Sequence, residues 1–160
     1  MQEAQSPGFL AALGRVPSGL FIVTAADADK RCAYLASFVQ QVSFEPMLFA
    51  IACHPQRYPF QLISKTKKFG LSIIPESDKI LMKMFAKGHG PDEDPLASVA
   101  AHVIDGVPLL KDSIGGAVFD VVQETTPGDH AIFFGKPKDG VLFDADLRPW
   151  VHIRKSAKNY

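Results

Sequence analysis

Short apolar segments separated by polar, glycine- or proline-containing turns run along most of this chain. Leu20–Ala25 and Met47–Cys53 are apolar throughout, as is typical of strands covered on both faces. Ala26 to Lys30 is a polar turn, so the segments on either side of it are predicted to form a hairpin. Further strands are predicted at Cys32–Val39, Phe69–Ile74, Ala117–Gln123, His130–Gly135, Val141–Phe143 and Trp150–Ile153.

Helical spacing of apolar residues is confined to three short segments, Phe9–Leu13, Tyr58–Lys65 and Lys79–Phe85. From Ala86 to Pro95 the glycines, prolines and acidic residues predict an exposed loop or a lid. Many short strands with few helices favour a mainly β fold, a β-barrel with peripheral helices. Because no repeat or linker divides the chain, we expect one domain over residues 1–160.

The composition is that of an ordinary globular protein. Of 160 residues, 47% are hydrophobic and 21% charged, and 17 basic residues balance 17 acidic ones. This balance gives no field that would attract nucleic acid or an anionic membrane. No apolar run reaches membrane-spanning length, and Met1-Gln-Glu lacks the basic region of a signal peptide. We therefore expect a cytoplasmic protein.

Neither the cysteines nor the histidines have the spacing of a redox or metal-binding site. Cys32 and Cys53 lie in apolar strand-like segments without Cys-x-x-Cys spacing, so we predict neither a disulfide nor a redox pair. The five histidines are scattered, and we predict no metal site.

The segment Ala33–Pro46 carries the clearest chemical signal. Ala36 and Ser37 leave a strand surface almost bare, so a flat ligand could approach the backbone, although close sheet packing would give the same pattern. We interpret the residues after Phe38 as a polar turn before the next strand. Neutral donors and acceptors beside that surface are Ser37, Gln40, Gln41 and Ser43.

Together with Gly128-Asp129-His130 and Gly135, the motif Ala33–Phe38 followed by Ser43–Pro46 resembles the flavin reductase-like family of FMN-binding split barrels. The resemblance runs from Val16 to Tyr160. It implies a split-barrel fold, a homodimer and FMN as cofactor, with FAD as the alternative. The tail, Phe143–Asp146, Val151–Lys155 and Tyr160, is similar to the flavin reductase module of flavodiiron proteins.

The resemblance also implies a set of site residues. Backbone near Leu35 to Ser37 would contact the isoalloxazine, and Arg57, at the start of the predicted helix, would bind the phosphate. A solvated surface arginine is the alternative for Arg57. Pro59 and Pro95 stand where relatives carry a hydroxyl or a basic residue, which weakens the expected phosphate contacts. The full predicted cofactor set is Tyr34, Leu35, Ala36, Ser37, Phe38, Ser43, His54, Arg57, Tyr58 and His130.

His130 is the predicted catalytic residue, because the family histidine of this motif lies near the flavin and the nicotinamide. A strand-end histidine bonded to backbone is the alternative, and Asp129 is expected to be a turn residue. Pro137 is expected to end its strand early or to lie at a sheet edge. His152, Arg154 and Lys155 form a basic patch that is either a binding surface or a solvated strand edge.

The activity implied by the resemblance is an FMN-dependent NAD(P)H:flavin oxidoreductase. Hydride would pass from the nicotinamide to flavin N5 and then to a flavin, oxygen or a separate acceptor protein. One alternative is a non-enzymatic flavin-binding or electron-transfer module, and another is a relative of the pyridoxamine phosphate oxidases. The sequence has no Gly-x-Gly-x-x-Gly after a strand and no nucleophile context around Ser18 or Ser64, which excludes a Rossmann site and a serine hydrolase.

Overall fold

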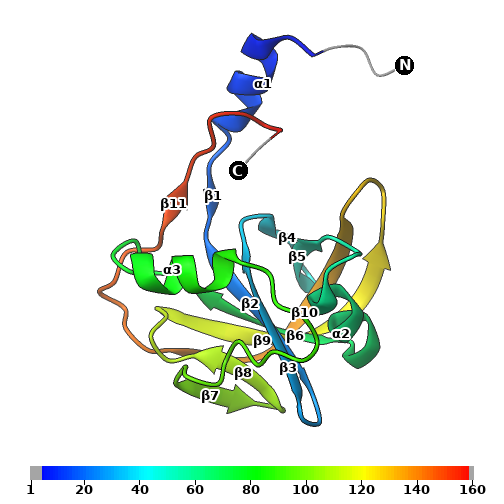
Figure 1. The fold of residues 1–160 in the computed structure, drawn as a ribbon, viewed down its shortest axis with the longest axis vertical. Coiled ribbons are helices and arrows are strands. Elements are labelled where there is room, and N and C mark those ends of the chain that lie inside the picture. The colour runs from blue at the N-terminus through cyan, green and yellow to red at the C-terminus, as the bar shows by residue number, and fades with distance from the viewer. Residues whose placement is uncertain (1–4, 159–160) are drawn as a thin grey trace.

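The structure is a computed structural model that describes residues 5–158, so Met1–Glu3 and Tyr160 lie outside the described residues. The fold is mainly β, as expected. The described residues also form three short helices, two beside the barrel and one on a projecting arm (Figure 1). The elements in chain order are α1 (Pro7–Gly14), β1 (Ser18–Gly19), β2 (Phe21–Asp27), β3 (Lys30–Ala36), β4 (Val39–Phe44), β5 (Met47–Cys53), α2 (Tyr58–Thr66), β6 (Lys68–Ile73), α3 (Lys79–Ala86), β7 (Ala101–Ile104), β8 (Val107–Leu110), β9 (Gly115–Thr125), β10 (Ala131–Leu142) and β11 (Val151–His152).

One seven-stranded antiparallel sheet forms the body, in the order β3-β2-β6-β9-β10-β5-β4. Its two edge strands, β3 and β4, are consecutive in the chain and are joined only by Ser37 and Phe38. Two residues cannot span an open sheet, so the sheet must curl until its edges meet. Hydrogen bonds cross this seam from Tyr34 Oη to Ala52 O (3.1 Å) and from Ala52 N to Phe38 O (3.0 Å).

Apolar residues that alternate along the strands fill the barrel. The largest cluster includes Val23, Ile51, Phe69 and Phe133, and it is extended by buried residues of α2. A second cluster joins α3 to the sheet through Phe85. Helix α2 therefore packs against β2, β3 and β6, and α3 packs against β3. Among the described residues, none of the helices combines the length and apolar character needed to cross a membrane.

An arm made of α1 and the β1–β11 ribbon projects from the barrel (Figure 1). Ser6 caps α1 by accepting a hydrogen bond from Phe9 N, and the C-terminal segment follows the helix back. Ala157 N donates to Leu10 O (2.9 Å) and Arg154 N to Gly14 O (3.1 Å). The two ends of the described chain are thus bound to each other.

The predicted polar turn after Phe38 is wrong. Residues 39–44 form the edge strand β4, which pairs with β5. Polar residues are tolerated there because an edge strand alternates between partly buried and exposed positions. The predicted strand Cys32–Val39 is therefore divided at the seam. Strand β3 ends at Ala36, and Val39 is the first residue of β4.

The strands predicted separately at His130–Gly135 and Val141–Phe143 are one strand, β10. Pro137 does not end it. Beyond Gly135, β10 pairs only with β9, so Pro137 lies on an edge stretch, beside a register shift, where its missing N–H is tolerated. The β7–β8 hairpin was not predicted. It turns at Asp105-Gly106, where both residues have positive φ.

Candidate functional site

A cavity of about 460 Å³, the main cavity, lies among the described residues and opens at the seam between the two sheet edges. Such a volume is in the range of small-molecule sites. Eight of the ten predicted cofactor residues line it: Tyr34, Leu35, Ala36, Ser37, Phe38, His54, Arg57 and His130. Ser43 does not line it, because the bulged β4 carries that residue away along the β4–β5 hairpin.

The seam explains why these residues meet. The end of β3 and the two linking residues supply Ala36 and Ser37, both of them buried. The chain leaves β5 directly into His54 and Arg57, while His130 immediately precedes β10, the neighbour of β5. The end of β3, its link to β4 and the segment between β5 and α2 therefore all border the main cavity. Ala36 lines the cavity and also packs in the largest core cluster, so its small side chain fits both the predicted ligand surface and close sheet packing.

A second cavity of about 340 Å³ adjoins the first and shares Tyr34 and Arg57 with it. Tyr58 lies here rather than in the main cavity, beside the buried Pro59. The other wall is the loop segment 88–91, which lies within the irregular segment predicted at 86–95. Arg57 thus stands at the junction of the two cavities.

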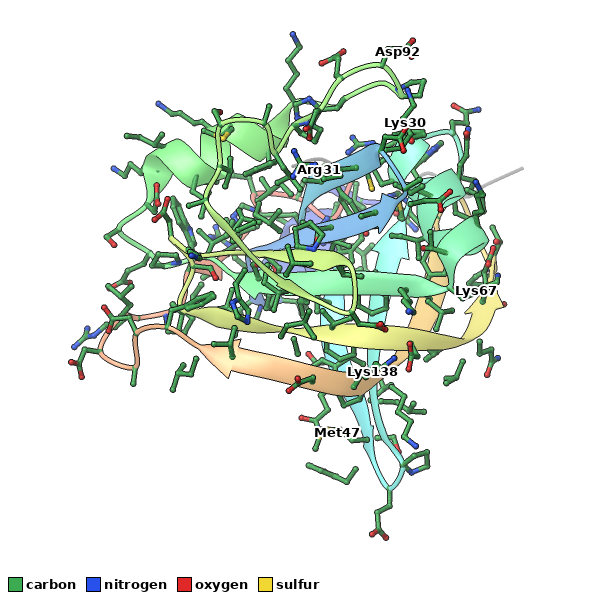
Figure 2. The ribbon with its side chains drawn as sticks, turned by 90° about the horizontal axis from the view of Figure 1, so that it is seen from below. Lys30, Arg31, Met47, Lys67, Asp92 and Lys138 are labelled. Carbon is green, nitrogen blue, oxygen red and sulfur yellow. The ribbon has the colours of Figure 1, made fainter. Side chains whose placement is uncertain are left out.

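The loop over the second cavity is bound to β3. Lys30 Nζ donates to Pro91 O (2.9 Å) and lies 3.5 Å from an Asp92 carboxylate oxygen. Figure 2 labels Lys30, Arg31 and Asp92 in this region. Arg31 pairs with Asp94, whose carboxylate also accepts a hydrogen bond from Leu96 N. The Arg31 guanidinium lowers the pKa of Asp94. These contacts hold the loop over the cavity.

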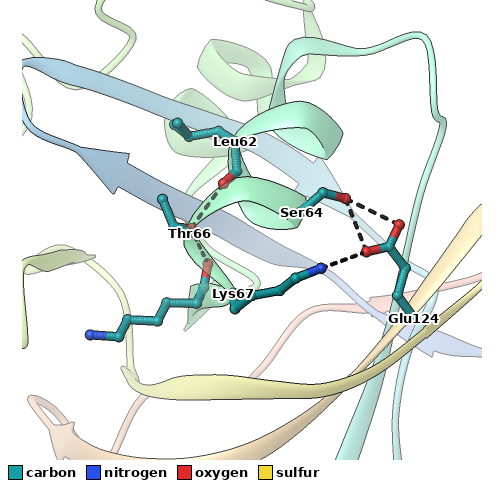
Figure 3. Close-up of polar contacts among 6 residues, drawn as sticks. Leu62, Ser64, Thr66, Lys67 and Glu124 are labelled. Carbon is teal, nitrogen blue, oxygen red and sulfur yellow. Dashed lines mark hydrogen bonds and ion pairs between the residues drawn. The ribbon is translucent and has the colours of Figure 1, made fainter.

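Helix α2 is anchored at its far end, which fixes the position of Arg57 at its start (Figure 3). Ser64 Oγ and Lys67 Nζ both donate to the Glu124 carboxylate of β9, at 3.1 Å. Thr66 Oγ1 donates to Leu62 O (2.9 Å), and Lys67 ends the helix in a left-handed conformation. At the other end, Arg57 is the N-cap residue and its side chain makes no cap hydrogen bond.

Aromatic and imidazole rings form a row along the main cavity. The ring centroids of His54 and His130 are 5.4 Å apart, and those of His130 and Phe38 are 5.8 Å apart. The Arg154 guanidinium lies 5.1 Å from the Phe38 ring centroid. The tail arginine, assigned to a basic patch in the sequence, therefore packs over an aromatic ring.

The two histidines differ in tautomer. Gln56 N donates to His54 Nδ1 (3.2 Å), so in neutral His54 the ring proton is on Nε2. His130 Nδ1 lies 2.9 Å from Asp129 Oδ1, and a carboxylate only accepts, so in His130 the proton is on Nδ1. Asp129 is thus more than a turn residue. The His130 imidazole in turn lowers the pKa of the Asp129 carboxyl.

The wall shared by the two cavities is uncharged apart from Arg57. Burial raises the pKa of Tyr34 well above its ordinary value, and burial raises the pKa of Cys53 to about 11. Cys32 and Cys53 are both free thiols. Within residues 5–158 no group of three or more His, Cys, Asp or Glu side chains could hold a metal ion. The donor set suits a neutral planar group with an anionic end.

The residues on the opposite wall of the main cavity were not predicted from the sequence to belong to a site. Leu20, Met82, Ala86, Trp150 and His152 come from β2's entry, α3 and the arm. His152 belongs to the basic patch predicted to be either a binding surface or a solvated strand edge, and the structure places it in the cavity wall. Only the pairing of β1 with β11 reveals the position of His152, and no local sequence pattern shows that pairing.

Comparisons with known proteins agree with this geometry. Residues 13–160 match the family model described as "Flavin reductase like domain". The chain is 34% identical over 151 residues to "Putative diflavin flavoprotein A 6" of Nostoc sp. strain PCC 7120, and 33% identical to "Diflavin flavoprotein A 1" of Synechocystis sp. strain PCC 6803. Each match covers 93% of this chain and 26% of the relative, so the chain spans about a quarter of their length.

Solved structures share the fold. "Streptomyces globisporus C-1027 NADH:FAD oxidoreductase SgcE6" superposes with a TM-score of 0.82 at 20% identity, covering 91% of this chain and 86% of that one. "Flavin reductase PheA2 in native state" gives 0.79 at 24% identity, covering 96% and 95%. With the family model matching nearly the whole chain, this protein belongs to the flavin reductase-like family.

Proposed function

We propose that this chain is an FMN-dependent NAD(P)H:flavin oxidoreductase. The observation that carries the proposal is the seam cavity, where the small residues Ala36 and Ser37, three imidazoles and one guanidinium come together. The family supports flavin oxidoreductase activity in general. FMN, the nicotinamide donor and the residue roles below belong to the proposal.

The residues fit a flavin in two respects. The main cavity is of ligand size and its wall is largely apolar and neutral, which suits a planar ring system. Arg57, at the junction with the second cavity, offers the planar donor pair that binds phosphate. When bound there, a flavin would supply the redox chemistry by accepting a hydride from reduced nicotinamide.

The protein's own part is to bind, orient and exclude water. Ala36 and Ser37 allow close approach of a ring, and Ser37 supplies a hydroxyl. Asp129 holds the His130 imidazole in one tautomer, and we assign His130 as the residue that contacts the reacting rings. Pro59 removes one N–H from the first turn of α2, so more of the phosphate binding falls to Arg57.

The names of relatives support nicotinamide and flavin as ligands. One solved structure of the same fold, at 18% identity, is titled as SgcE6 "in complex with NAD and FAD fragments". The electron acceptor, which is a flavin, oxygen or an acceptor protein, is also part of our proposal. A single domain over residues 1–160, a homodimer and a cytoplasmic location also remain proposals.

A stopped-flow experiment tests the role of His130 and the activity together. FMN-loaded protein is mixed anaerobically with NADH or NADPH, and flavin absorbance is followed for wild type and His130→Asn at full FMN occupancy. We expect reduction in wild type and a rate at least tenfold lower in the variant. Equal rates would remove His130 from the site chemistry. Flavin binding without reduction in wild type would favour the electron-transfer module instead.

A further inference from the structure

Exposed apolar side chains are concentrated on two projecting elements, the arm (residues 5–19 and 151–158) and the β4–β5 hairpin. Of the fourteen large apolar side chains that are exposed among the described residues, nine belong to these elements or to the base of the hairpin. They are Phe9, Leu13, Val16, Val151 and Ile153 on the arm, and Phe38, Val42, Phe44 and Met47 on the hairpin or at its base. Apolar residues gathered in this way mark interaction surfaces, whereas those of an ordinary monomer surface are scattered.

The arm has almost no core of its own. Within α1 only Gly14 is buried, and a Cβ built on it would lie 2.7 Å from the backbone nitrogen of Ser156. A helix of eight residues is too short to be stable in water through its own hydrogen bonds. Figure 1 shows the arm standing clear of the barrel. The arm therefore needs packing that the barrel of the same chain does not supply.

The two surfaces carry opposite charge. The arm contains no acidic residue and four basic ones, Arg15, Arg154, Lys155 and Lys158, although the whole chain has equal numbers of each kind. The hairpin contains no basic residue and carries Glu45 at its exposed tip. Arg15, Lys155 and Lys158 are exposed too, and neither they nor Glu45 form an ion pair within the described part of the chain. The arm and the hairpin are thus complementary in charge and alike in apolar character.

The arm and the hairpin of one chain begin close together and point in different directions. Ser18 of β1 and Gln40 of β4 line the same shallow surface groove, of about 310 Å³, at their bases. The arm runs along the long axis in Figure 1, and the hairpin projects at Met47 in Figure 2, a view turned by 90°. Because their ends diverge, the arm cannot cover the hairpin of its own chain.

We propose that the arm of each subunit lies against the β4–β5 hairpin of a second copy of this chain. With two-fold symmetry the same contact forms twice and closes the assembly, so both surfaces of both copies are covered. Phe9 and Leu13 then cover the apolar hairpin side chains, and the cations of the arm approach Glu45. Since Trp150 and His152 place the base of the arm in the wall of the main cavity, the contact also holds that wall in position.

A double substitution on α1 tests the contribution of the arm. Phe9→Ser combined with Leu13→Ser removes two exposed apolar side chains that lie one helical turn apart. Sedimentation velocity over a range of concentrations measures the dissociation constant of the dimer. We expect an increase of about a hundredfold or more, because each side chain is lost twice in a two-fold dimer.

The matched control is Ile80→Ser combined with Met84→Ser. These two residues are also exposed and apolar, and they have the same spacing on α3. Their replacement should leave the dissociation constant within a few-fold of that of wild type.

Cross-linking between differently substituted chains identifies the surfaces that meet. Ala12→Cys protein, carrying a tag that changes its size on a gel, is mixed with Val42→Cys protein under conditions that allow subunit exchange. Both positions are exposed, and a short, flexible bis-maleimide then joins cysteines that lie near each other. Covalent dimers are expected between the two variants and not within either variant alone. Cys32 and Cys53 are buried, so the wild-type chain should not cross-link.

Covalent dimers within Ala12→Cys or within Val42→Cys protein, in place of the mixed product, would overturn the proposal, because like surfaces would then meet. An unchanged dissociation constant in the α1 double variant, or a wild-type protein that is monomeric at micromolar concentration, would overturn it as well. If the α1 double variant does not fold, the cross-linking result decides alone. None of these outcomes depends on flavin or nicotinamide, so the proposed function fails or stands separately, in the stopped-flow experiment.

Discussion

At the scale of single residues, Arg57 gives the most specific prediction about the ligand, which is that its phosphate is bound. It is the one cation at the junction of the two cavities, among the residues that the structure describes as lining them both. Arg57→Ala should weaken FMN by about tenfold or more and leave riboflavin nearly unchanged, because only FMN carries the phosphate. Parallel titrations of both flavins measure the ratio.

Arg148→Ala is the control for this titration, since Arg148 is exposed and lines neither cavity. Its affinities should match those of wild type. Equal losses of FMN and riboflavin in Arg57→Ala would show that the arginine acts on the fold or on the ring, and the phosphate role would be withdrawn.

The two buried thiols predict how stability depends on alkaline pH. Burial raises the pKa of Cys32 to about 12 and that of Cys53 to about 11, from 9.0. Above pH 9 the unfolded chain loses these protons while the folded chain keeps them, so the free energy of unfolding falls as pH rises. Each thiol contributes a fall of about 1 kcal/mol per pH unit up to its folded pKa.

Urea unfolding at pH 8, 9.5 and 10.5 measures this dependence. The variant carrying both Cys32→Ala and Cys53→Ala should show a flatter profile than wild type over the same range. Profiles of equal slope would mean that other groups cause the alkaline loss.

Residue patterns in the sequence predicted the cavity wall that contains Ala36, Ser37 and Arg57, and they did not predict the wall that contains His152. Ala36, Ser37 and Arg57 were found because a motif carries them in two short segments. His152 belongs to a two-residue strand whose partner, Ser18, lies more than a hundred positions earlier, so nothing local marks it. Its buried Nε2 becomes visible only when the arm is in place.

At the scale of elements, Gly135 shows why β10 can cross the barrel. A Cβ built on Gly135 would lie 2.6 Å from the Phe69 ring and 2.8 Å from Phe119 Cβ. These two rings stack at 4.9 Å between centroids, and both are buried. The glycine that the sequence motif contains is thus explained by close packing of the strand on this pair.

Gly135→Ala should lower the free energy of unfolding by about 1–3 kcal/mol, the usual cost of overpacking a core. Urea denaturation measures it. Gly128→Ala is the control, because nothing lies within 4 Å of its added Cβ. A Gly135→Ala protein as stable as wild type would mean that the aromatic pair shifts at no cost.

Strand β4 shows where pattern-based prediction of elements fails. Its residues alternate between partly buried and exposed, and two glutamines occupy its centre, so the apolar signal is weak. The strand exists because β5 supplies a partner and Phe38 links it to β3 across the seam. Tertiary pairing, rather than propensity, decides such an edge strand.

At the scale of the whole molecule, the β4–β5 hairpin extends beyond the barrel, as Figure 2 shows at Met47. Phe44 at its tip is 84% exposed, and Val42 and Met47 are also exposed. Exposed apolar groups on one projecting element mark an interaction surface. The proposed homodimer would cover this hairpin.

Sedimentation velocity tests this proposal. Wild type should sediment at twice the 17.4 kDa chain mass. Phe44→Lys should shift it to the monomer at micromolar concentration, because burying a charge at an interface is costly. Ile80→Lys, at an exposed apolar position on α3, is the control and should remain dimeric. A dimeric Phe44→Lys protein would place the interface elsewhere.

The seam accounts for both fold and site, since the closure of the barrel by two residues is what opens the cavity between its edges. The central claim is that this cavity holds a flavin that reduced nicotinamide can reach. The most direct measurement is the visible spectrum of FMN-loaded, desalted protein under anaerobic conditions, before and after addition of NADH and of NADPH. Retained yellow colour that bleaches with either donor is the predicted result. Colour that persists with both donors, or no retained flavin, would contradict the account.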